Sequence, residues 1–382
     1  MVPRDLLPEL LNCAREYPVI TLTGPRQSGK TTLAKAAFPH LGYANFERPD
    51  LRAQFAEDPR GFLAGFAQGA IFDEIQHVPE ICSWLQDLVD QAPAPGRFVL
   101  TGSQHFGLTN QVTQSLAGRT AILELLPFSR HELETGGFLA HDLDTALWSG
   151  AYPPVHDRRL RPERWYADYL ATYLERDLRQ LAAIRDLSLF QRFLKLAAGN
   201  VGQLFVASRL AGDLGVSNKT IEHWTSLLEA SYLAVRIPPY HRNLRKRLTR
   251  SSKFYFLDTG LACHLLDIKE PGQLTAHPLR GAIFENWVAA EFLKEDANRG
   301  WRSRLMFWRT YDGQKIDFLR EDGNKLELIE CKAGQTIIPR FLSPLKRVSS
   351  LMTDREIHPY LVYGGTEERT LNQTRILPWN RL

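Results

Sequence analysis

The sequence lacks the features that mark disulfide-bonded and membrane-spanning proteins. Its 382 residues include only four cysteines, scattered at Cys13, Cys82, Cys263 and Cys331 without a C-x-x-C pair. This usage argues against a disulfide framework or a zinc knuckle and predicts a cytoplasmic protein. No apolar run approaches the ~18 residues that a membrane span needs, so we expect no membrane partner. Internal repeats and low-complexity tracts are also missing from the sequence.

The sequence also has little net charge. Lys and Arg number 47 against 43 Asp and Glu, which gives a formal net charge of +4. Such a balance is compatible with a nucleic-acid partner but does not demand one, so the distribution of charge must decide. The composition, 44% hydrophobic and 24% charged, is ordinary for a globular protein, and the length predicts two or three domains.

The clearest motif lies in the stretch Pro18–Thr32, P-V-I-T-L-T-G-P-R-Q-S-G-K-T-T. A short β-branched, apolar run leads into a glycine loop, and a helix-forming run, Leu33–Phe38, follows it. The loop matches the Walker A pattern G-x-x-x-x-G-K-[ST] at a junction of strand and helix. The motif predicts ATP binding by Gly24, Pro25, Arg26, Gln27, Ser28, Gly29, Lys30, Thr31 and Thr32.

Each residue type in this loop has a physical role in binding a polyphosphate. Gly24 and Gly29 allow backbone angles and a close approach that a Cβ would block. The loop amides and the helix N-terminus then point toward the phosphates. Lys30 supplies a compact positive charge to the β- and γ-phosphates, and the Thr31 hydroxyl can ligate Mg²⁺.

Four more strand-like runs follow the loop, separated by helical stretches such as Ile81–Val89; the runs lie at 42–46, 70–73, 97–101 and 120–125. This alternation predicts a parallel sheet with both faces covered. The run at 70–73 ends in Asp73-Glu74, a Walker B pattern. We expect Asp73 to hold Mg²⁺ through water and Glu74 to orient and deprotonate the attacking water. The alternative is a solvated strand end.

Two single residues are further candidates for the catalytic site. Ser103 follows the next strand, in T-G-S-Q, where a polar group could touch the γ-phosphate. Arg119, in S-L-A-G-R-T, precedes the last strand and is a candidate arginine finger that reaches a neighbouring subunit. The alternative for each is a turn residue with a local hydrogen bond or ion pair.

These segments together resemble the AAA-type ATPase domain of a large group of bacterial and archaeal proteins. The matching pieces are the opening P-R-D-L-L, then G-P-R-Q-S-G-K-T-T-L, I-F-D-E-I-Q, L-T-G-S-Q, and S-L-A-G-R followed by L-L-P-F-S. The resemblance implies an AAA-type P-loop ATPase domain over residues 1–130. Members of the group carry a C-terminal nuclease-like domain of unknown function, so the resemblance extends over nearly the whole chain.

Residues 131–185 are expected to form a helical connector. The segment S-G-A-Y-P at 149–153 departs slightly from the G-G-Y-P usual in the group, and we interpret it as a turn without chemistry. Trp165–Leu181 follows as an amphipathic helix whose Y-L-E-R-D also resembles the group. Arg176 in it could contact a nucleotide in trans, but a helix-surface ion pair with Glu175 or Asp177 is the favoured interpretation.

Residues 186–270 are expected to form a winged-helix domain, within which Leu204–Leu233 has helix-turn-helix spacing. One helix is expected at Val206–Leu214, with Gly215 in the turn and Ser217 as the N-cap of the next helix. That second helix is expected to bury Ile221, Trp224, Leu228 and Tyr232. Its outward residues would then be those of a recognition helix, Asn218, Lys219, Glu222 and His223.

A basic segment, H-R-N-L-R-K-R-L-T-R-S-S-K at His241–Lys253, follows and contains no acidic residue. It leads directly into the strand-like F-Y-F-L-D, which predicts the wing of a winged helix that binds phosphates. The alternative is a winged fold used only for subunit packing. The candidate DNA-binding residues are Lys219, Arg242, Arg245, Lys246, Arg247, Arg250 and Lys253.

Residues 271–382 combine an apolar helix with a hairpin. In the helix Ala282–Leu293, Glu285 lies among small or apolar neighbours and needs a partner or a function. The strands Lys315–Leu319 and Leu326–Lys332 are joined by E-D-G-N, a hairpin signal. Alternation places Glu330 and Lys332 at the end of an otherwise apolar row.

The set Glu285, Asp317, Glu330 and Lys332 resembles the arrangement of PD-(D/E)xK nucleases. The resemblance implies that Asp317 and Glu330 bind one or two Mg²⁺, that Glu285 assists, and that Lys332 orients water or stabilises the phosphate. The alternative is a retained fold in which these residues form a structural ion-pair network.

The sequence therefore predicts an α/β architecture: an AAA-type P-loop ATPase with a parallel sheet, then a winged helix and a small mixed α/β nuclease-like domain. The expected activity is ATP hydrolysis, with Mg²⁺, coupled to DNA binding or remodelling in a homo-oligomer. Two alternatives stay open. One is an ATP-regulated metal-dependent nuclease, with branched DNA as a candidate substrate. The other is a signalling or assembly switch that does not bind DNA.

Overall fold

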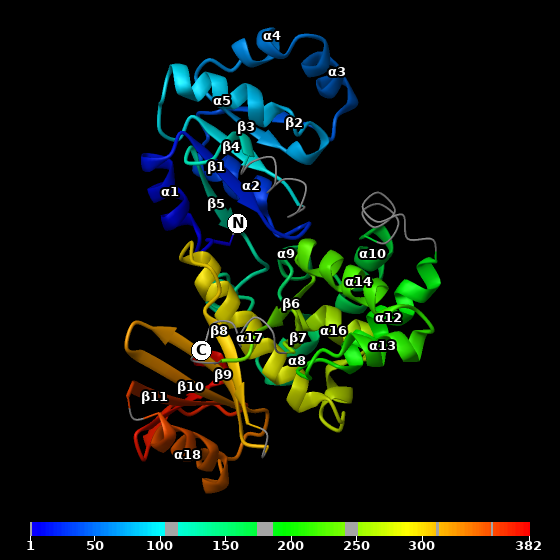
Figure 1. Cartoon of the computed structure of the whole chain (residues 1–382), viewed down its shortest axis with the longest axis vertical. Helices are drawn as coiled ribbons and strands as arrows, with labels where there is room; N and C mark the ends of the chain where they lie inside the picture. Colours follow the sequence, from blue (N-terminus) through cyan, green and yellow to red (C-terminus); the bar gives the residue numbers. More distant parts are fainter. Residues whose placement is uncertain (1, 104–113, 174–185, 241–250, 311–312, 353) are drawn as a thin grey trace. The chain divides into compact units, whose positions relative to one another are not determined.

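The computed structural model describes residues 2–103, 114–173, 186–240, 251–310, 313–352 and 354–382. The chain divides into two compact units. Unit 1 contains residues 1–136, with 230–232 and 294–302; unit 2 contains 137–229, 233–293 and 303–382. The described residues of unit 1 form one sheet, and those of unit 2 form a two-stranded and a six-stranded sheet (Figure 1).

Unit 1 is built on a five-stranded sheet in the order β2-β3-β4-β1-β5 (Figure 1). Each neighbouring pair is parallel, as the alternation of strands and helices predicts. The strands are β1 (Val19–Thr23), β2 (Gly42–Asn45), β3 (Ala70–Asp73), β4 (Phe98–Thr101) and β5 (Thr120–Glu124). The helices are α1 (Leu7–Glu16), α2 (Lys30–Ala37), α3 (Pro49–Glu57), α4 (Pro59–Ala64), the 3₁₀ turn η1 (Ile75–His77), α5 (Ile81–Gln91) and α7 (Arg130–Thr135).

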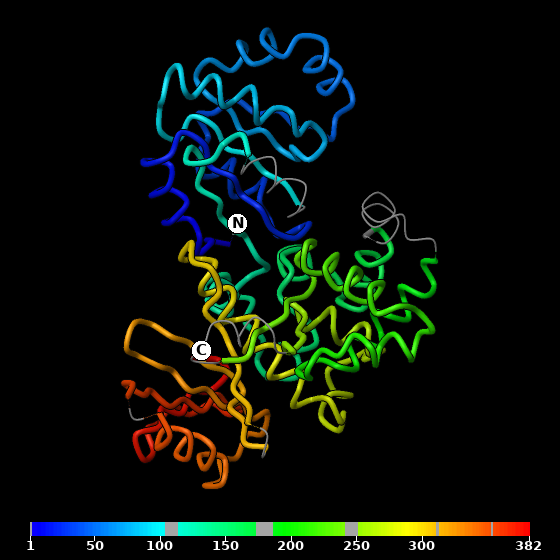
Figure 2. Tube along the Cα trace, in the orientation of Figure 1, coloured from blue at the N-terminus to red at the C-terminus, as the bar shows by residue number. Residues whose placement is uncertain are grey.

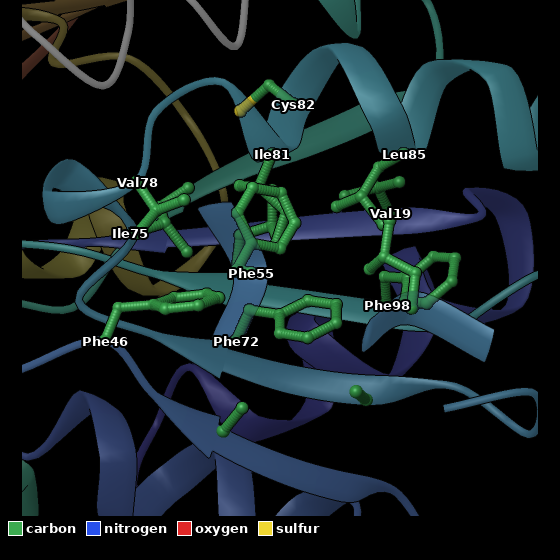
Figure 3. Close-up of a cluster of buried hydrophobic side chains, with 14 of the residues drawn as sticks. Val19, Phe46, Phe55, Phe72, Ile75, Val78, Ile81, Cys82, Leu85 and Phe98 are labelled. Atoms are coloured by element: carbon green, nitrogen blue, oxygen red, sulfur yellow. The ribbon is translucent and has the colours of Figure 1, made fainter. Parts of the chain in front are cut away.

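Alternate side chains of each strand enter different cores, because successive residues of a strand point to opposite faces. On one face, Val19, Phe72 and Phe98 pack against η1, α3 and α5 in a phenylalanine-rich cluster (Figure 3). On the other face, Ile20 and Ile71 pack against α1 and α2. The strands are therefore buried on both sides, which explains their near-continuous apolar sequences.

Unit 2 begins with helices and a short hairpin. Its helices are α8 (Leu143–Ser149), α9 (Pro153–Asp157), α10 (Pro162–Tyr173), α12 (Leu187–Gly199), α13 (Ala207–Leu214), α14 (Asn218–Ala230), α16 (Thr259–Leu265) and η3 (Pro271–Leu274). The strands β6 (Ala234–Ile237) and β7 (Lys253–Phe256) pair antiparallel, and Leu204 forms a further antiparallel bridge with Lys253. Gly215 between α13 and α14 is left-handed, with φ of 69°.

The second sheet of unit 2 is mixed, in the order β12-β13-β11-β10-β9-β8. The hairpin of β9 and β10 is antiparallel, whereas β10 and β11 are parallel. The chain leaves β10 along α18 and returns as β11, a path visible in the Cα trace (Figure 2). The remaining elements are α17 (Arg280–Asn298), β8 (Leu305–Arg309), β9 (Lys315–Asp322), β10 (Lys325–Lys332), η4 (Pro339–Leu342), α18 (Ser343–Leu351), β11 (Glu356–Tyr363), β12 (Arg369–Leu371), β13 (Thr374–Pro378) and η5 (Trp379–Arg381).

The predicted second helix of the helix-turn-helix needs one correction. Ile221, Trp224 and Leu228 are buried as expected, and Ser217 caps the helix by accepting from the Thr220 amide at 3.1 Å. The helix, however, ends at Ala230, and Tyr232 adopts a positive φ of 57° beyond it. The helical stripe of apolar residues therefore continues past the last helical turn, and Tyr232 belongs to unit 1.

A second correction concerns Lys253, which the basic run predicts to be a surface contact for phosphate. Its side chain is only 9% exposed, and its Nζ donates to Glu285 Oε1 at 2.7 Å. Lys253 is the first residue of β7 and is buried like the rest of that strand, although the basic run before it suggested an exposed side chain.

None of the helices in the described ranges is long and apolar enough to span a bilayer.

Candidate functional site

The glycine loop joins the carboxyl end of β1 to the N-terminus of α2. Gly24 has φ of 141°, and a Cβ there would lie 2.2 Å from the Leu125 carbonyl oxygen. Gly29, the N-cap of α2, has φ of 97°. Both glycines thus occupy conformations that other residues rarely adopt. The Ser28 hydroxyl is fully buried and has no hydrogen-bond partner among the described residues.

Lys30 is buried at the start of α2, 5% exposed, and folds back over the loop. Its Nζ donates to the Gly24 carbonyl at 3.0 Å and to the Pro25 carbonyl at 2.7 Å. Burial lowers the pKa of Lys30 to about 8, although the carboxylates of Glu74 and Asp73 act in the opposite direction. The ammonium is therefore incompletely compensated by these groups.

Asp73, at the end of β3, accepts hydrogen bonds from three hydroxyl groups. Thr31 Oγ1 lies 2.9 Å from Oδ2, and Tyr43 Oη lies 2.7 Å from the same oxygen. Thr101 Oγ1 donates to Oδ1. The structure thus brings the Walker A threonine and the Walker B aspartate into direct contact. Tyr43 and Thr101 carry no local motif that could have indicated this role.

Glu74 and Ser103 also meet, at the carboxyl ends of neighbouring strands. The strand β4 lies between β1 and β3, which places Ser103 beside the Walker B residues. Ser103 Oγ donates to Glu74 Oε2 at 3.3 Å, and Gln76 Nε2 donates to the same oxygen. Glu74 itself has a positive φ of 57°. The carboxylate is therefore fixed by two side chains at this edge of the sheet.

Arg119 is not part of this cluster. It precedes β5, and its carbonyl accepts from the amide of Val19, the first residue of β1. Since the strands are parallel, Arg119 lies at the sheet edge opposite the glycine loop. Its guanidinium forms a two-pronged ion pair with Asp90, with N···O distances of 2.5 and 2.7 Å.

Arg4, a buried arginine to which no motif gave a role, contacts the glycine loop through its guanidinium. Arg4 is 8% exposed and donates from Nη1 to the Ser28 carbonyl and from Nη2 to the Leu126 carbonyl, both at 2.6 Å. Its Nε donates to Glu132 Oε1 at 2.9 Å. The Arg4 side chain also stacks on Phe128, 4.9 Å from the ring centroid. The opening P-R-D and the later L-L-P-F-S therefore meet at the loop.

Tyr232 is a second contact of the loop strand that the sequence did not indicate. Its hydroxyl donates to Thr23 Oγ1 at 2.9 Å, and it lies 3.4 Å from Glu124 Oε1. Burial, followed by the charge of Glu124, raises the pKa of Tyr232, so the hydroxyl stays protonated.

In unit 2 the carboxylates Asp317 and Glu330 face ammonium groups. Lys315 Nζ lies 3.2 Å from Asp317 Oδ1, and Lys332 Nζ lies 2.8 Å from Glu330 Oε2 and 3.9 Å from Asp317 Oδ2. The Cys331 amide donates to Asp317 Oδ2 at 3.0 Å. Glu330 Oε1 is buried and has no partner among the described residues.

The electrostatics of this cluster differ from one carboxyl group to the next. Burial, reinforced by the nearby Asp317 charge, raises the pKa of Glu330 to about 7. Burial also acts to raise the pKa of Asp317, but the ammonium groups of Lys315, Lys253 and Lys332 outweigh it and lower that pKa. Asp317 is therefore ionised at neutral pH.

Glu285 on α17 points to other partners. Its Oε1 accepts from Lys253 Nζ at 2.7 Å and from the Tyr255 hydroxyl at 2.6 Å. Burial, followed by the charge of Asp317, raises the pKa of Glu285. Among the residues that the structure describes, no group of three His, Cys, Asp or Glu side chains could hold a metal ion.

The predicted basic surface is described only in part. Lys219 is exposed on α14, as expected. The predictions for Arg176, Arg242, Arg245, Lys246, Arg247 and Arg250 lie outside the described residues.

Family models match three successive parts of the chain. They are an AAA domain over residues 16–134, a domain of unknown function (DUF8612) over residues 140–272, and a second such domain (DUF4143) over residues 280–382. The first of these confirms the P-loop ATPase-like domain that the resemblance implied.

Two mycobacterial proteins match nearly the whole chain. The uncharacterised proteins Rv2008c of Mycobacterium tuberculosis and Mb2031c of Mycobacterium bovis are each 32% identical over 376 residues, covering 97% of this chain and 82% of each relative. The chain belongs to the family of these proteins. An uncharacterised protein of Haemophilus influenzae is 24% identical over 346 residues, covering 81% of each chain.

Two solved structures are similar in part. The Walker-type ATPase paby2304 of Pyrococcus abyssi has a TM-score of 0.47 at 15% identity, covering 69% of this chain and 96% of that one. A DNA replication initiation factor has a TM-score of 0.27 at 13% identity, covering 56% of this chain and 69% of that one. These scores are low, so the fold of unit 1 rests on its own strand order and on the AAA-domain match.

Proposed function

We propose that this protein binds and hydrolyses ATP in unit 1 and couples the nucleotide state to DNA binding or remodelling. The observation that carries the ATPase proposal is the contact of Thr31 with Asp73, in which Walker A and Walker B side chains meet at one sheet edge. Lys30 would bind the β- and γ-phosphates. Glu74, held by Ser103 and Gln76, would orient the attacking water.

The residues of this site fit both ATP and Mg²⁺. Gly24 allows the loop to pass against the Leu125 carbonyl, where a Cβ would clash, and the buried Ser28 hydroxyl in the same loop still needs a partner. A carboxylate and a threonine hydroxyl form an all-oxygen donor set, which Mg²⁺ prefers. Thr31 and Asp73 would hold the ion, which neutralises developing phosphate charge when bound.

The ATPase proposal is tested by comparing wild type with Lys30→Ala for release of phosphate from ATP. Lys269→Ala, an exposed lysine in unit 2, is the control. We expect hydrolysis to be lost in the first variant and kept in the second. Equal rates in all three proteins, after removal of contaminating ATPases, would reject the proposal.

The DNA-binding part of the proposal rests on residues 186–270 as a winged helix. The order of elements supports this assignment: α12, the bridge at Leu204, the pair α13 and α14, and then the hairpin of β6 and β7. Lys219 is exposed at the start of α14, where a recognition helix presents its side chains. We accordingly propose domains at 1–130, 131–185, 186–270 and 271–382.

Residues 271–382 are proposed to have a nuclease-like fold. The support is the order of α17, the antiparallel strands β8, β9 and β10, then α18 and the parallel strand β11. In this arrangement, however, the carboxylates do not fit a resident Mg²⁺, because the ammonium groups of Lys315 and Lys332 already neutralise Asp317 and Glu330 and would repel a second cation. Glu285 is likewise engaged by Lys253 and Tyr255.

Cleavage of DNA remains the second candidate function, favoured by the convergence of Asp317, Glu330 and Lys332; it requires the Lys315 ammonium to leave Asp317 so that a metal ion can bind there. The comparison that decides it is wild type against Asp317→Ala on nicked, forked and four-way DNA with Mg²⁺ or Mn²⁺. Product from wild type alone would establish cleavage, and absence of product from both would reject it.

Arg119 stays the candidate arginine finger of a homo-oligomer. Arg119→Ala should then lower the rate of ATP hydrolysis without lowering ATP affinity.

A further inference from the structure

A cavity of about 440 Å³ opens beside β9 and β10 in unit 2. Its charged lining consists of four cations and one carboxylate, Lys315, Lys332, Arg340, Arg347 and Glu330. A cavity of this size can hold a ligand group as large as one nucleotide. The excess of positive charge selects an anionic ligand.

Two of the cations are available to a ligand. Arg340 in η4 and Arg347 in α18 are exposed, and neither guanidinium has a hydrogen bond or ion pair within the described residues. Lys315 and Lys332, by contrast, are held by Asp317 and Glu330. A planar guanidinium pairs with two phosphate oxygens at once, so two unpaired arginines at one cavity suit a phosphate group.

Two other features of the lining also point to a ligand. Ser343 and Pro344, the first residues of the nine-residue helix α18, line the cavity, so the positive end of the helix dipole faces it. Glu330 Oε1 is buried and lacks a donor among the described residues. A buried acceptor without a donor is costly, and an internal DNA phosphodiester has no hydrogen to donate, so this oxygen fits a water molecule that bridges it to the phosphate.

We propose that this cavity binds a phosphate group of a nucleic-acid backbone directly, through Arg340 and Arg347, without a bridging metal ion. Because ammonium groups already neutralise Asp317 and Glu330, we assign the phosphate to the two arginines and not to a metal ion. The choice of nucleic acid rests on the proposed coupling to DNA. Free nucleotides share the phosphate chemistry, and the arms of the experiment separate the two sources.

The experiment measures DNA binding by the full chain with fluorescence anisotropy, in EDTA and without ATP, over a series of NaCl concentrations. The test variant is Arg340→Gln/Arg347→Gln. The matched controls are Lys325→Gln and Lys346→Gln, because these lysines are exposed on β10 and α18 but do not line the cavity. Thermal melting of each variant checks that these surface changes leave the fold intact.

The loss of two phosphate contacts has a defined signature. The slope of log K against log salt should become shallower by about 1.4 to 1.8, and affinity should fall roughly 10- to 100-fold. Each control should keep the wild-type slope, since the loss of even one phosphate contact would change it by about 1. An unchanged slope in the double variant, or wild-type binding that disappears in EDTA, would overturn the proposal. Failure of wild type to bind any DNA would overturn it as well.

The free-nucleotide arm adds AMP as a competitor. We expect DNA to bind without AMP and AMP to compete only weakly with it. If AMP binds and needs both arginines, and DNA does not bind, the cavity is a nucleotide site and the nucleic-acid proposal is overturned. ATP hydrolysis by the double variant separates this result from the proposed function. If the double variant keeps the wild-type salt slope while DNA still stimulates ATP hydrolysis, only the cavity proposal is rejected. Absence of wild-type hydrolysis removes the ATPase proposal, while the slopes still decide the cavity.

Discussion

The buried arginine behind the glycine loop gives the most quantitative prediction. In Arg4→Met, Glu132 keeps its burial but loses its charged partner, and the Ser28 and Leu126 carbonyls lose their donors. Removing one partner of a buried ion pair costs about 3–5 kcal/mol. Because the Ser28 carbonyl belongs to the loop, we also expect the Kd for ATP to rise about tenfold, which corresponds to about 1.4 kcal/mol.

The matched control is Arg52→Met. Arg52 also donates to two carbonyls, those of Phe46 and Glu47, at 2.8 and 3.1 Å, but it is partly exposed and has no buried carboxylate partner in the part of the chain that the structure describes. Its loss should cost about 1 kcal/mol. Urea unfolding followed by circular dichroism measures the free energy of unfolding, and a fluorescent ATP analogue measures affinity. If Arg4→Met destabilises the protein no more than Arg52→Met does, Arg4 is not the buried support of the loop.

Buried polar groups give four further predictions. Tyr232→Phe removes the hydroxyl that donates to Thr23, directly after α14, and should reduce the stimulation of hydrolysis by DNA with little effect on the basal rate; equal stimulation would contradict it. The lowered pKa of Lys30, about 8, predicts that ATP affinity falls as pH rises through 8 and that binding takes up protons there, which calorimetry in buffers of different ionisation enthalpy measures. The same lowered pKa means that the cost of burying the Lys30 ammonium is full below pH 8. It is relieved between pH 8 and 10.5, so the contribution of Lys30 to the free energy of unfolding becomes more favourable over that range. Lys253→Met should leave Glu285 buried without its cation and cost about 3–5 kcal/mol, whereas Lys253→Met/Glu285→Gln should recover much of that loss in urea unfolding.

The sheet of unit 1 was predictable because its strands are short β-branched runs that end in chemically distinctive residues. The strand bounds at Val19–Thr23 and Ala70–Asp73 agree with the prediction to the residue. The contact of Thr31 with Asp73 follows from parallel strands whose carboxyl ends share an edge.

Partners that are far apart in sequence could not be predicted, because no local pattern encodes them. Arg4 and Leu126 are 122 positions apart, and Tyr232 and Thr23 are 209 apart. The predicted helix extended beyond its actual end at Ala230, because the apolar spacing that includes Tyr232 does not show that this residue has a positive φ. Lys253 was grouped with the basic run because the density of positive charge in a segment does not show which of its residues is buried.

The central claim is that ATP hydrolysis is coupled to DNA. The most direct test measures the ATPase rate of wild type and Lys30→Ala with and without a panel of duplex, single-stranded and branched DNA. We expect a basal rate in wild type that rises with at least one DNA structure, and no hydrolysis in Lys30→Ala. A wild-type rate that no DNA changes would contradict it.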